Sequence, residues 1–171
     1  MPDGKGIVMR LETDRLIIDH FTGSDVSMWA EIEADPDVRR FVDGQCLSRE
    51  QASQYVQMNM DSYVENGFGR FAVRSRASGS LLGMCGFLPE EEDIDFGYRY
   101  SVETWGKGIG YEAAEKVLHH GREHLRLAPL CAVVALENIG SVRILEKLGF
   151  KFEKSFLVGE IKAARYVISG H

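Results

Sequence analysis

The 171-residue chain is predicted to fold as one α/β (α+β) domain, residues 1–171, around a mostly antiparallel sheet. Two patterns predict this class. Short segments that alternate between apolar and polar residues return on one another through glycine-containing turns, as antiparallel strands do. A strand-like segment, a helix-like segment and the continuous apolar run 130–136 then follow in order, which predicts one crossover and one parallel strand pair.

The first part of the chain predicts one strand and two helices. Residues 15–20 (RLIIDH) have the composition of a strand. Ser24 is a suitable N-cap for a helix that ends before Pro36, because the residue before a proline avoids the helical conformation. Ser48 and Gln51 form a capping-box pair, which predicts the start of a second helix.

The middle of the chain predicts a hairpin. Gly67 is expected to end the second helix, because glycine readily adopts the left-handed conformation of a helix C-cap. Residues 70–76 alternate as a strand, and residues 81–88 return as its partner after the turn at residues 77–79.

The remainder of the chain predicts the crossover and a second hairpin. Gly149 is expected to end the last helix, and Gly159 is expected to form the hairpin turn. The expected elements are a strand over residues 94–102, a helix over 112–127, a strand over 130–136, a helix over 141–148 and strands over 152–157 and 162–168.

The composition is that of an ordinary globular domain with an acidic balance. Apolar residues make up 44% and charged residues 27% of the chain, and the formal net charge is −6. This balance argues against nucleic-acid binding, which needs clustered lysine and arginine. No apolar run reaches the length of a membrane span, and the start of the chain lacks a signal-peptide core. Cys46, Cys85 and Cys131 are expected to be reduced, mostly buried thiols, so we expect a cytoplasmic protein without membrane or nucleic-acid partners.

The segment WGKGIGY, residues 105–111, is the strongest candidate for a binding site. Its three glycines lie between a strand-like and a helix-like segment, where backbone N–H groups and the helix dipole meet, as in a phosphate-binding turn. A Walker loop is disfavoured because Gly108 rather than Ser or Thr follows Lys107. A dinucleotide fingerprint is disfavoured because Tyr111 replaces its third glycine. A plain helix-entry turn is an equal alternative on the turn alone.

Two motifs resemble the GNAT superfamily of acyl-CoA-dependent N-acetyltransferases. They are FGYRYSVETWGKGIGYEAA, residues 96–114, and ENIGSVRILEKLGF, residues 137–150. The Trp-Gly-Lys-Gly form of the turn resembles the branch that contains the RimJ and RimL enzymes. The resemblance covers nearly the whole chain. It implies a sheet of six to seven strands flanked by about four helices, with a splayed parallel pair formed by the strands at 94–102 and 130–136.

The resemblance implies that acetyl-CoA is the acyl donor and that the glycine turn binds the pyrophosphate of coenzyme A. The pantetheine arm would then pair with the backbone of the strand at residues 98–102. For Lys107, Arg143 and Lys147, the alternative is a side chain directed to solvent. The implied coenzyme A-binding residues are Tyr98, Tyr100, Val102, Gly106, Lys107, Gly108, Ile109, Gly110, Tyr111, Asn138, Arg143 and Lys147.

The resemblance also implies Ser141, Asn138 and Asp95 as catalytic residues. Ser141 would donate a hydrogen bond to the departing thiolate, and Asn138 would contact the pantetheine or order the splayed strands. Their simpler alternatives are a first-turn helix residue and a helix cap. Asp95 is the first candidate for the base that accepts the amine proton, ahead of Glu103 and the acidic loop at residues 90–93. For that loop, a solvated turn is the favoured alternative.

The predicted function is the transfer of an acetyl group from acetyl-CoA to a primary amine by direct attack within a ternary complex. The amine acceptor is a protein N-terminus or a small molecule, and the protein is a monomer or a homodimer. Leu145 stands where many relatives have a tyrosine general acid, so the alternative is a catalytically silent acyl-CoA-binding or regulatory module. No metal is expected, because the glutamate that directly follows the first histidine of a zinc-protease motif is absent after His120.

Overall fold

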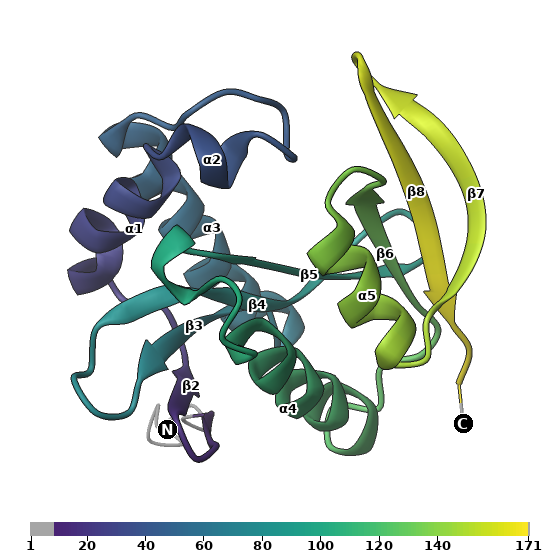
Figure 1. Ribbon diagram of the computed structural model, residues 1–171. Coiled ribbons are helices and arrows are strands. Elements are labelled where there is room, and N and C mark those ends of the chain that lie inside the picture. The colour runs from purple at the N-terminus through teal and green to yellow at the C-terminus, as the bar shows by residue number, and fades with distance from the viewer. Residues whose placement is uncertain (1–8, 171) are drawn as a thin grey trace.

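The computed structural model describes residues 9–170, which form one eight-stranded sheet and five helices (Figure 1). The order of the strands in the sheet is β1-β2-β3-β4-β5-β6-β8-β7. The strands are β1 (Arg10–Glu12), β2 (Leu16–Asp19), β3 (Arg70–Ser75), β4 (Leu81–Pro89), β5 (Ile94–Tyr100), β6 (Leu130–Ala135), β7 (Lys151–Val158) and β8 (Ile161–Ile168). The helices are α1 (Val26–Glu33), α2 (Pro36–Arg39), α3 (Arg49–Asn66), α4 (Ile109–Glu123) and α5 (Ile139–Lys147), with short 3-10 turns η1 (Gly23–Asp25) and η2 (Val102–Thr104).

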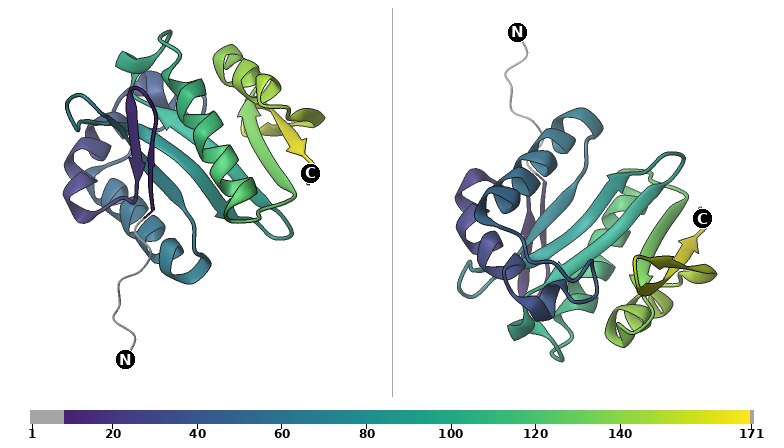
Figure 2. Two further views of the ribbon diagram at one scale, coloured as in Figure 1. Left: turned by 90° about the horizontal axis from the view of Figure 1, so that it is seen from below. Right: turned by 90° about the horizontal axis from the view of Figure 1, so that it is seen from above.

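The helices cover the two faces of the sheet (Figure 2). On the face under α1 and α3, Trp29 and Val56 pack with Met84 of β4. On the opposite face, Val117 of α4 packs in a second core that includes Phe87 of β4. Within residues 9–170, none of the helices is long and apolar enough to cross a membrane.

The ends of several elements follow the sequence prediction. The Ser48 hydroxyl accepts a hydrogen bond from the Gln51 N–H at 3.1 Å, and the Gln51 side chain accepts one from the Ser48 N–H at 2.9 Å. Gly67 ends α3 with a φ of 79°. Gly149 and Gly159 also have positive φ, at the end of α5 and in the β7–β8 turn. The mixed fold class, the crossover and both hairpins are therefore confirmed.

The parallel pair β5–β6 is joined at only one end. The two strands pair at Ile94 with Leu130 and at Asp95 with Cys131, and no further pair follows between them. Beyond that point β6 continues to pair with β8, while β5 continues to pair with β4. The strands therefore diverge toward the carboxyl end of β5, which confirms the splayed pair that the resemblance implies.

Two short elements are not predicted by the sequence. Strand β1 spans Arg10–Glu12, which is too short for an alternating pattern to be visible. Helix α1 ends before Pro36 as expected, but Pro36 itself begins α2, because proline fits the first position of a helix. The Asp35 carboxylate caps α2 by accepting the Asp37 N–H at 2.9 Å. The sheet consequently has eight strands rather than six to seven.

The bounds of two predicted elements also differ. The expected strand at 94–102 ends at Tyr100, because Val102 begins η2 and accepts a hydrogen bond from the Trp105 N–H at 3.0 Å. Val102 is therefore outside the strand, and its side chain packs on the core under α1 and α3. Helix α4 begins at Ile109, earlier than the expected residue 112, since the glycine turn leads directly into the helix.

The three cysteines are free thiols with different exposure. Cys85 and Cys131 are buried, whereas Cys46 is exposed between α2 and α3. Burial raises the pKa of Cys85 to about 12 and that of Cys131 to about 11, so both remain protonated near neutral pH. This agrees with the expectation of reduced, mostly buried thiols.

We expect iodoacetamide to alkylate Cys46 alone in the native protein, because the thiolate is the reacting form and only this thiol is accessible. Mass spectrometry after labelling at about pH 8 should find one added group in native protein and three in urea. Native labelling of Cys85 at the rate of Cys46 would contradict the packing of β4.

Candidate active site

A cleft of about 840 Å³ opens where β5 and β6 diverge. Its walls come from β5, the turn before α4, the start of α5, β6, β8 and the segment that follows α2. In Figure 1, α2 and the β7–β8 hairpin stand on opposite sides of this region, with β5 and α5 between them. The cleft thus meets two helix N-termini and the side chains of a separate helical layer.

The glycine turn lines this cleft at the N-terminus of α4. Gly106 and Gly108 have φ values of 73° and 78°, a left-handed conformation that strains residues with a Cβ. Gly108 is the N-cap of α4, and the Glu112 N–H donates to the Gly108 carbonyl at 3.1 Å. Residues 109–111 come before Glu112 in the first turn of the helix, so their N–H groups have no acceptor within the helix. These groups lie at the positive end of the helix dipole. Together they form a site suited to an anion.

The start of β2 holds the turn in position. Arg15 donates from Nη1 to the Lys107 carbonyl at 2.8 Å and from Nε to the Glu112 carboxylate at 2.8 Å. The Thr13 hydroxyl donates to the same carboxylate. On the other side, the Trp105 indole donates to the Tyr100 carbonyl at 3.1 Å. These contacts fix the turn between β2 and β5.

Tyr98 and Tyr100 tie β5 to the two helix N-termini. The Tyr98 hydroxyl donates to the Ser141 carbonyl at 2.9 Å, and the Tyr100 hydroxyl donates to the Gly110 carbonyl at 3.1 Å. Burial raises the pKa of both tyrosines, so both hydroxyls remain protonated donors at neutral pH.

The backbone of β5 faces the gap between the strands. The Ser101 N–H donates to the Leu82 carbonyl at 2.8 Å. Because hydrogen-bonded and non-bonded pairs alternate along an antiparallel ladder, the N–H groups of Tyr98 and Tyr100 point away from β4. They point toward β6, at the level where β6 has already separated from β5.

Asn138 and Ser141 lie together at the start of α5. The Asn138 side chain accepts the Ser141 N–H at 3.3 Å, so Asn138 is the N-cap of the helix and Ser141 is in its first turn. Both residues also line the cleft. Leu145, one turn further along, is buried in the core and lines the cleft as well.

Asp95 lines the cleft but is already paired with a buried arginine. Arg70, which is only 8% exposed, forms an ion pair with the Asp95 carboxylate. Its Nη1 donates to the carbonyls of Gly86 at 2.7 Å and Asp95 at 2.9 Å. A Cβ on Gly97 would lie 2.8 Å from Arg70 Nη2, so glycine is needed where the guanidinium crosses β5.

The remaining predicted site residues lie at or beyond the edge of the cleft. The Lys147 ammonium lies 3.9 Å from the ring centroid of Tyr111, and Arg143 is exposed on the same helix. The predicted residues outside the cleft lining are Val102, Lys107, Ile109, Arg143 and Lys147, whereas Tyr98, Tyr100, Gly106, Gly108, Gly110, Tyr111, Asn138, Ser141 and Asp95 line it.

The alternative bases are separated by the fold. Glu90 lines the cleft near the start of β5. Asp93 forms an ion pair with Arg165 of β8, and Glu103 is exposed outside the cleft lining. Within the described part of the chain, no group of three His, Cys, Asp or Glu residues is arranged to hold a metal ion.

The wall built by α2 and β5 is not predicted by the sequence. It contains Val38, Arg40, Phe41 and Val42, together with Arg99 from β5. Nothing in the local sequence identifies the α2 segment as part of a binding site, because only the tertiary fold brings it to the cleft. The signal for Arg99 was present, since alternation along a strand places it on the same face as Asp95.

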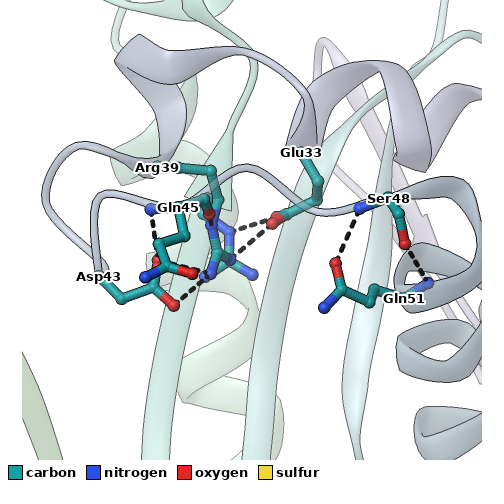
Figure 3. Close-up of polar contacts among 7 residues, drawn as sticks. Glu33, Arg39, Asp43, Gln45, Ser48 and Gln51 are labelled. Atoms are coloured by element: carbon teal, nitrogen blue, oxygen red, sulfur yellow. Dashed lines mark hydrogen bonds and ion pairs between the residues drawn. The ribbon is translucent and has the colours of Figure 1, made fainter.

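A buried ion-pair network, formed by Glu33, Arg39, Asp43 and Arg99, supports this wall. Glu33, at 0% exposure, pairs with Arg39 at 2.6 Å and also with Arg99 Nε. Arg39 lies between Glu33 and Asp43 (Figure 3). Nη2 of Arg39 donates to both carboxylate oxygens of Asp43, each at 3.0 Å. Arg39 Nε also donates to the Gln45 carbonyl at 2.7 Å, so the network fixes the segment that follows α2.

The chain has clear relatives. The acetyltransferase (GNAT) domain family matches residues 15–151. The uncharacterized N-acetyltransferase YoaA of Bacillus subtilis (strain 168) is 31% identical over 147 residues, which cover 84% of this chain and 83% of YoaA. The uncharacterized N-acetyltransferase p20 of Bacillus licheniformis is 29% identical over 147 residues, with coverages of 84% and 83%.

Solved structures share the same fold. An acetyltransferase (GNAT family) from Bacillus anthracis has a TM-score of 0.82 and 24% identity, covering 94% of this chain and 98% of its own. RimL, a ribosomal L7/L12 alpha-N-protein acetyltransferase crystallised in complex with coenzyme A, has a TM-score of 0.83 and 14% identity, with coverages of 95% and 98%. Because both sequence identities are below 25%, these two matches show a shared fold and no more.

Proposed function

Because the chain belongs to the GNAT acetyltransferase family, we propose that it transfers an acetyl group from acetyl-CoA to a primary amine. The observation that carries this proposal is the divergence of β5 from β6 beside the glycine turn that begins α4. This geometry combines an anion site with an extended backbone edge, which together match a diphosphate joined to a pantetheine arm.

In the proposed complex, the amides of residues 106–111 bind the diphosphate of coenzyme A. The pantetheine arm runs along the β5 backbone at Tyr98 and Tyr100, with Asn138 on the opposite wall. Arg143 and Lys147 of α5 are available for the 3′-phosphate at the outer edge, where Lys147 is held over the Tyr111 ring. Val102, which lies outside β5, contributes to the turn rather than to the strand edge.

The proposed reaction is a direct displacement. The amine lone pair attacks the thioester carbonyl carbon, and a β5 N–H directed into the gap stabilises the oxyanion. The carbon–sulfur bond then breaks, and the thiolate accepts a hydrogen bond from the Ser141 hydroxyl. Because the reference pKa of a thiol is about 8.5, the thiolate leaves without a strong acid, so Leu145 in place of a tyrosine is compatible with turnover.

The amine needs only a modest base. Deprotonating an α-amino group at pH 7 costs about 1 kcal/mol. The Asp95 carboxylate is already paired with Arg70. In the proposal, it therefore accepts the proton through a water molecule rather than by direct contact with the amine. Glu90, from the acidic loop at residues 90–93, also lines the cleft and is the alternative base.

The test is release of free coenzyme A when the protein is incubated with acetyl-CoA and a panel of amines, including peptides, with mass detection of acetylated products. We expect release that depends on both protein and amine. Thermal stabilisation by acetyl-CoA without turnover on any amine would favour the silent binding module instead. Failure of coenzyme A derivatives to bind would contradict both functions.

A further inference from the structure

Arg99 lines the cleft, and its guanidinium is only partly paired. It lies on β5 next to Tyr98, and strand alternation directs the two side chains to opposite faces of the sheet. Its Nε donates to Glu33, but Nη1 and Nη2 make no hydrogen bond to any described residue. Two of the nitrogens that recognise a carboxylate as a fork are therefore unoccupied on a wall of the cleft.

The orientation of Arg99 is fixed by its surroundings. The side chain is 14% exposed, and its guanidinium carbon lies 5.6 Å from the Trp29 ring centroid and 5.8 Å from that of Tyr55. Glu33, which is fully buried, is itself fixed by Arg39. A guanidinium held in this way loses little conformational entropy when it binds a ligand.

Arginines gather around Arg99 although the chain as a whole is acidic, while the carboxylates Glu90, Asp95 and Glu137 also line the cleft. Four arginines and three carboxylates meet at this part of the cleft and its support: Arg39, Arg40, Arg70, Arg99, Glu33, Asp43 and Asp95. Arg40 is the exposed member on the cleft wall, with its guanidinium over the Phe41 ring at 4.5 Å. Glu90 follows β4 beyond the Pro89–Ile94 pair, so it lies at the other end of β5 from Arg99.

We propose that Arg99 binds a carboxylate of the acceptor, so that the acceptor is an amine that also carries a carboxylate, such as an amino acid. The inference rests on the proposed acetyl transfer and names its substrate class. Arg99 stands between Tyr98 and Tyr100 on β5, the strand whose backbone faces the gap, and both tyrosines line the same cleft. Phe41, Val42 and Met84 line the same part of the cleft and favour an apolar side chain on the acceptor.

The first test compares leucine with leucinamide, and phenylalanine with phenylalaninamide, as acceptors for the wild-type protein. The amides lack the carboxylate but have less basic amines, so intrinsic reactivity favours them. We expect kcat/KM to be at least about 100-fold higher for the carboxylates, because a site built to pair with a group rejects the analogue that lacks it. Preference for the amides would overturn the inference while leaving acetyl transfer intact.

The second test uses Arg99→Gln and Arg99→Lys. Arg99→Gln should lower the ratio of kcat/KM for leucine to kcat/KM for leucinamide at least about 100-fold. Arg99→Lys, which keeps the charge but not the fork, should fall between Arg99→Gln and the wild type. An equal loss on both substrates, with acetyl-CoA binding retained, would overturn the inference. If Arg99→Gln does not fold, the wild-type comparison still decides.

A binding measurement separates this inference from the proposed function. If no amine is acetylated, calorimetry can compare N-acetylleucine with N-acetylleucinamide on the protein saturated with coenzyme A. Tighter binding of N-acetylleucine would support carboxylate recognition in a protein without turnover. Equal binding of the two compounds would contradict it.

Discussion

Replacing Gly108 with valine is expected to weaken acetyl-CoA binding by at least about tenfold, because each lost charge-assisted hydrogen bond costs about 1.5–3 kcal/mol. Gly108 has a φ of 78° at the N-cap of α4, where a β-branched residue is strained. A Cβ there would meet Nη2 of Arg15 at an ordinary contact distance of 3.5 Å, so the strain comes from the backbone conformation. The valine is therefore expected to shift the backbone amides that are proposed to bind the diphosphate. Calorimetric titration with acetyl-CoA measures the effect.

Gly79→Val is the matched control for backbone strain. Gly79 has a φ of 76° in the turn between β3 and β4, with open space around it and no place in the cleft lining. Both variants should lose about 1–3 kcal/mol of unfolding free energy. Only Gly108→Val should bind acetyl-CoA more weakly, whereas equal affinities for both variants would remove the turn from the binding site.

Glu33→Gln is expected to lower the free energy of unfolding by about 3 kcal/mol, since removing one partner of a buried ion pair costs about 3–5 kcal/mol. Glu33 is fully buried and pairs with both Arg39 and Arg99. The lower end of that range applies because Asp43 still pairs with Arg39 in the variant. Urea unfolding followed by circular dichroism measures the change.

Glu31→Gln is the control on the same helix, because Glu31 is exposed. It should change the unfolding free energy by no more than about 0.5 kcal/mol. If Glu33→Gln is as stable as Glu31→Gln, the network does not stabilise the wall formed by α2 and β5.

The fold could be predicted where local signals decide it. The Ser48–Gln51 capping box, the C-cap at Gly67 and the apolar run that becomes β6 each carry their structure in a few adjacent residues. The end of β5 could not be predicted in this way. Val102 has a strand-forming side chain, but the turn η2 and the core under α1 and α3 determine its place.

In the candidate site, too, the residues in contiguous motifs could be predicted from the sequence, whereas those set by tertiary contacts could not. The glycine turn and the start of α5 are contiguous motifs, and the structure brings them together on one cleft. Asp95 was visible in the sequence, but its partner Arg70 lies on a different strand and becomes adjacent only through the β3–β4–β5 order. The wall built by α2 and β5 depends on α2, a four-residue helix that is held in place by the ion pair between its own Arg39 and Glu33 of α1.

The most direct test of coenzyme A binding at the glycine turn is a calorimetric comparison of acetyl-CoA with S-acetylpantetheine, which lacks the diphosphate. We expect the wild-type protein to bind acetyl-CoA at least about tenfold more tightly, and Gly108→Val to remove most of this difference. Equal affinity of the wild-type protein for both compounds, or an unchanged difference in Gly108→Val, would contradict binding at this turn.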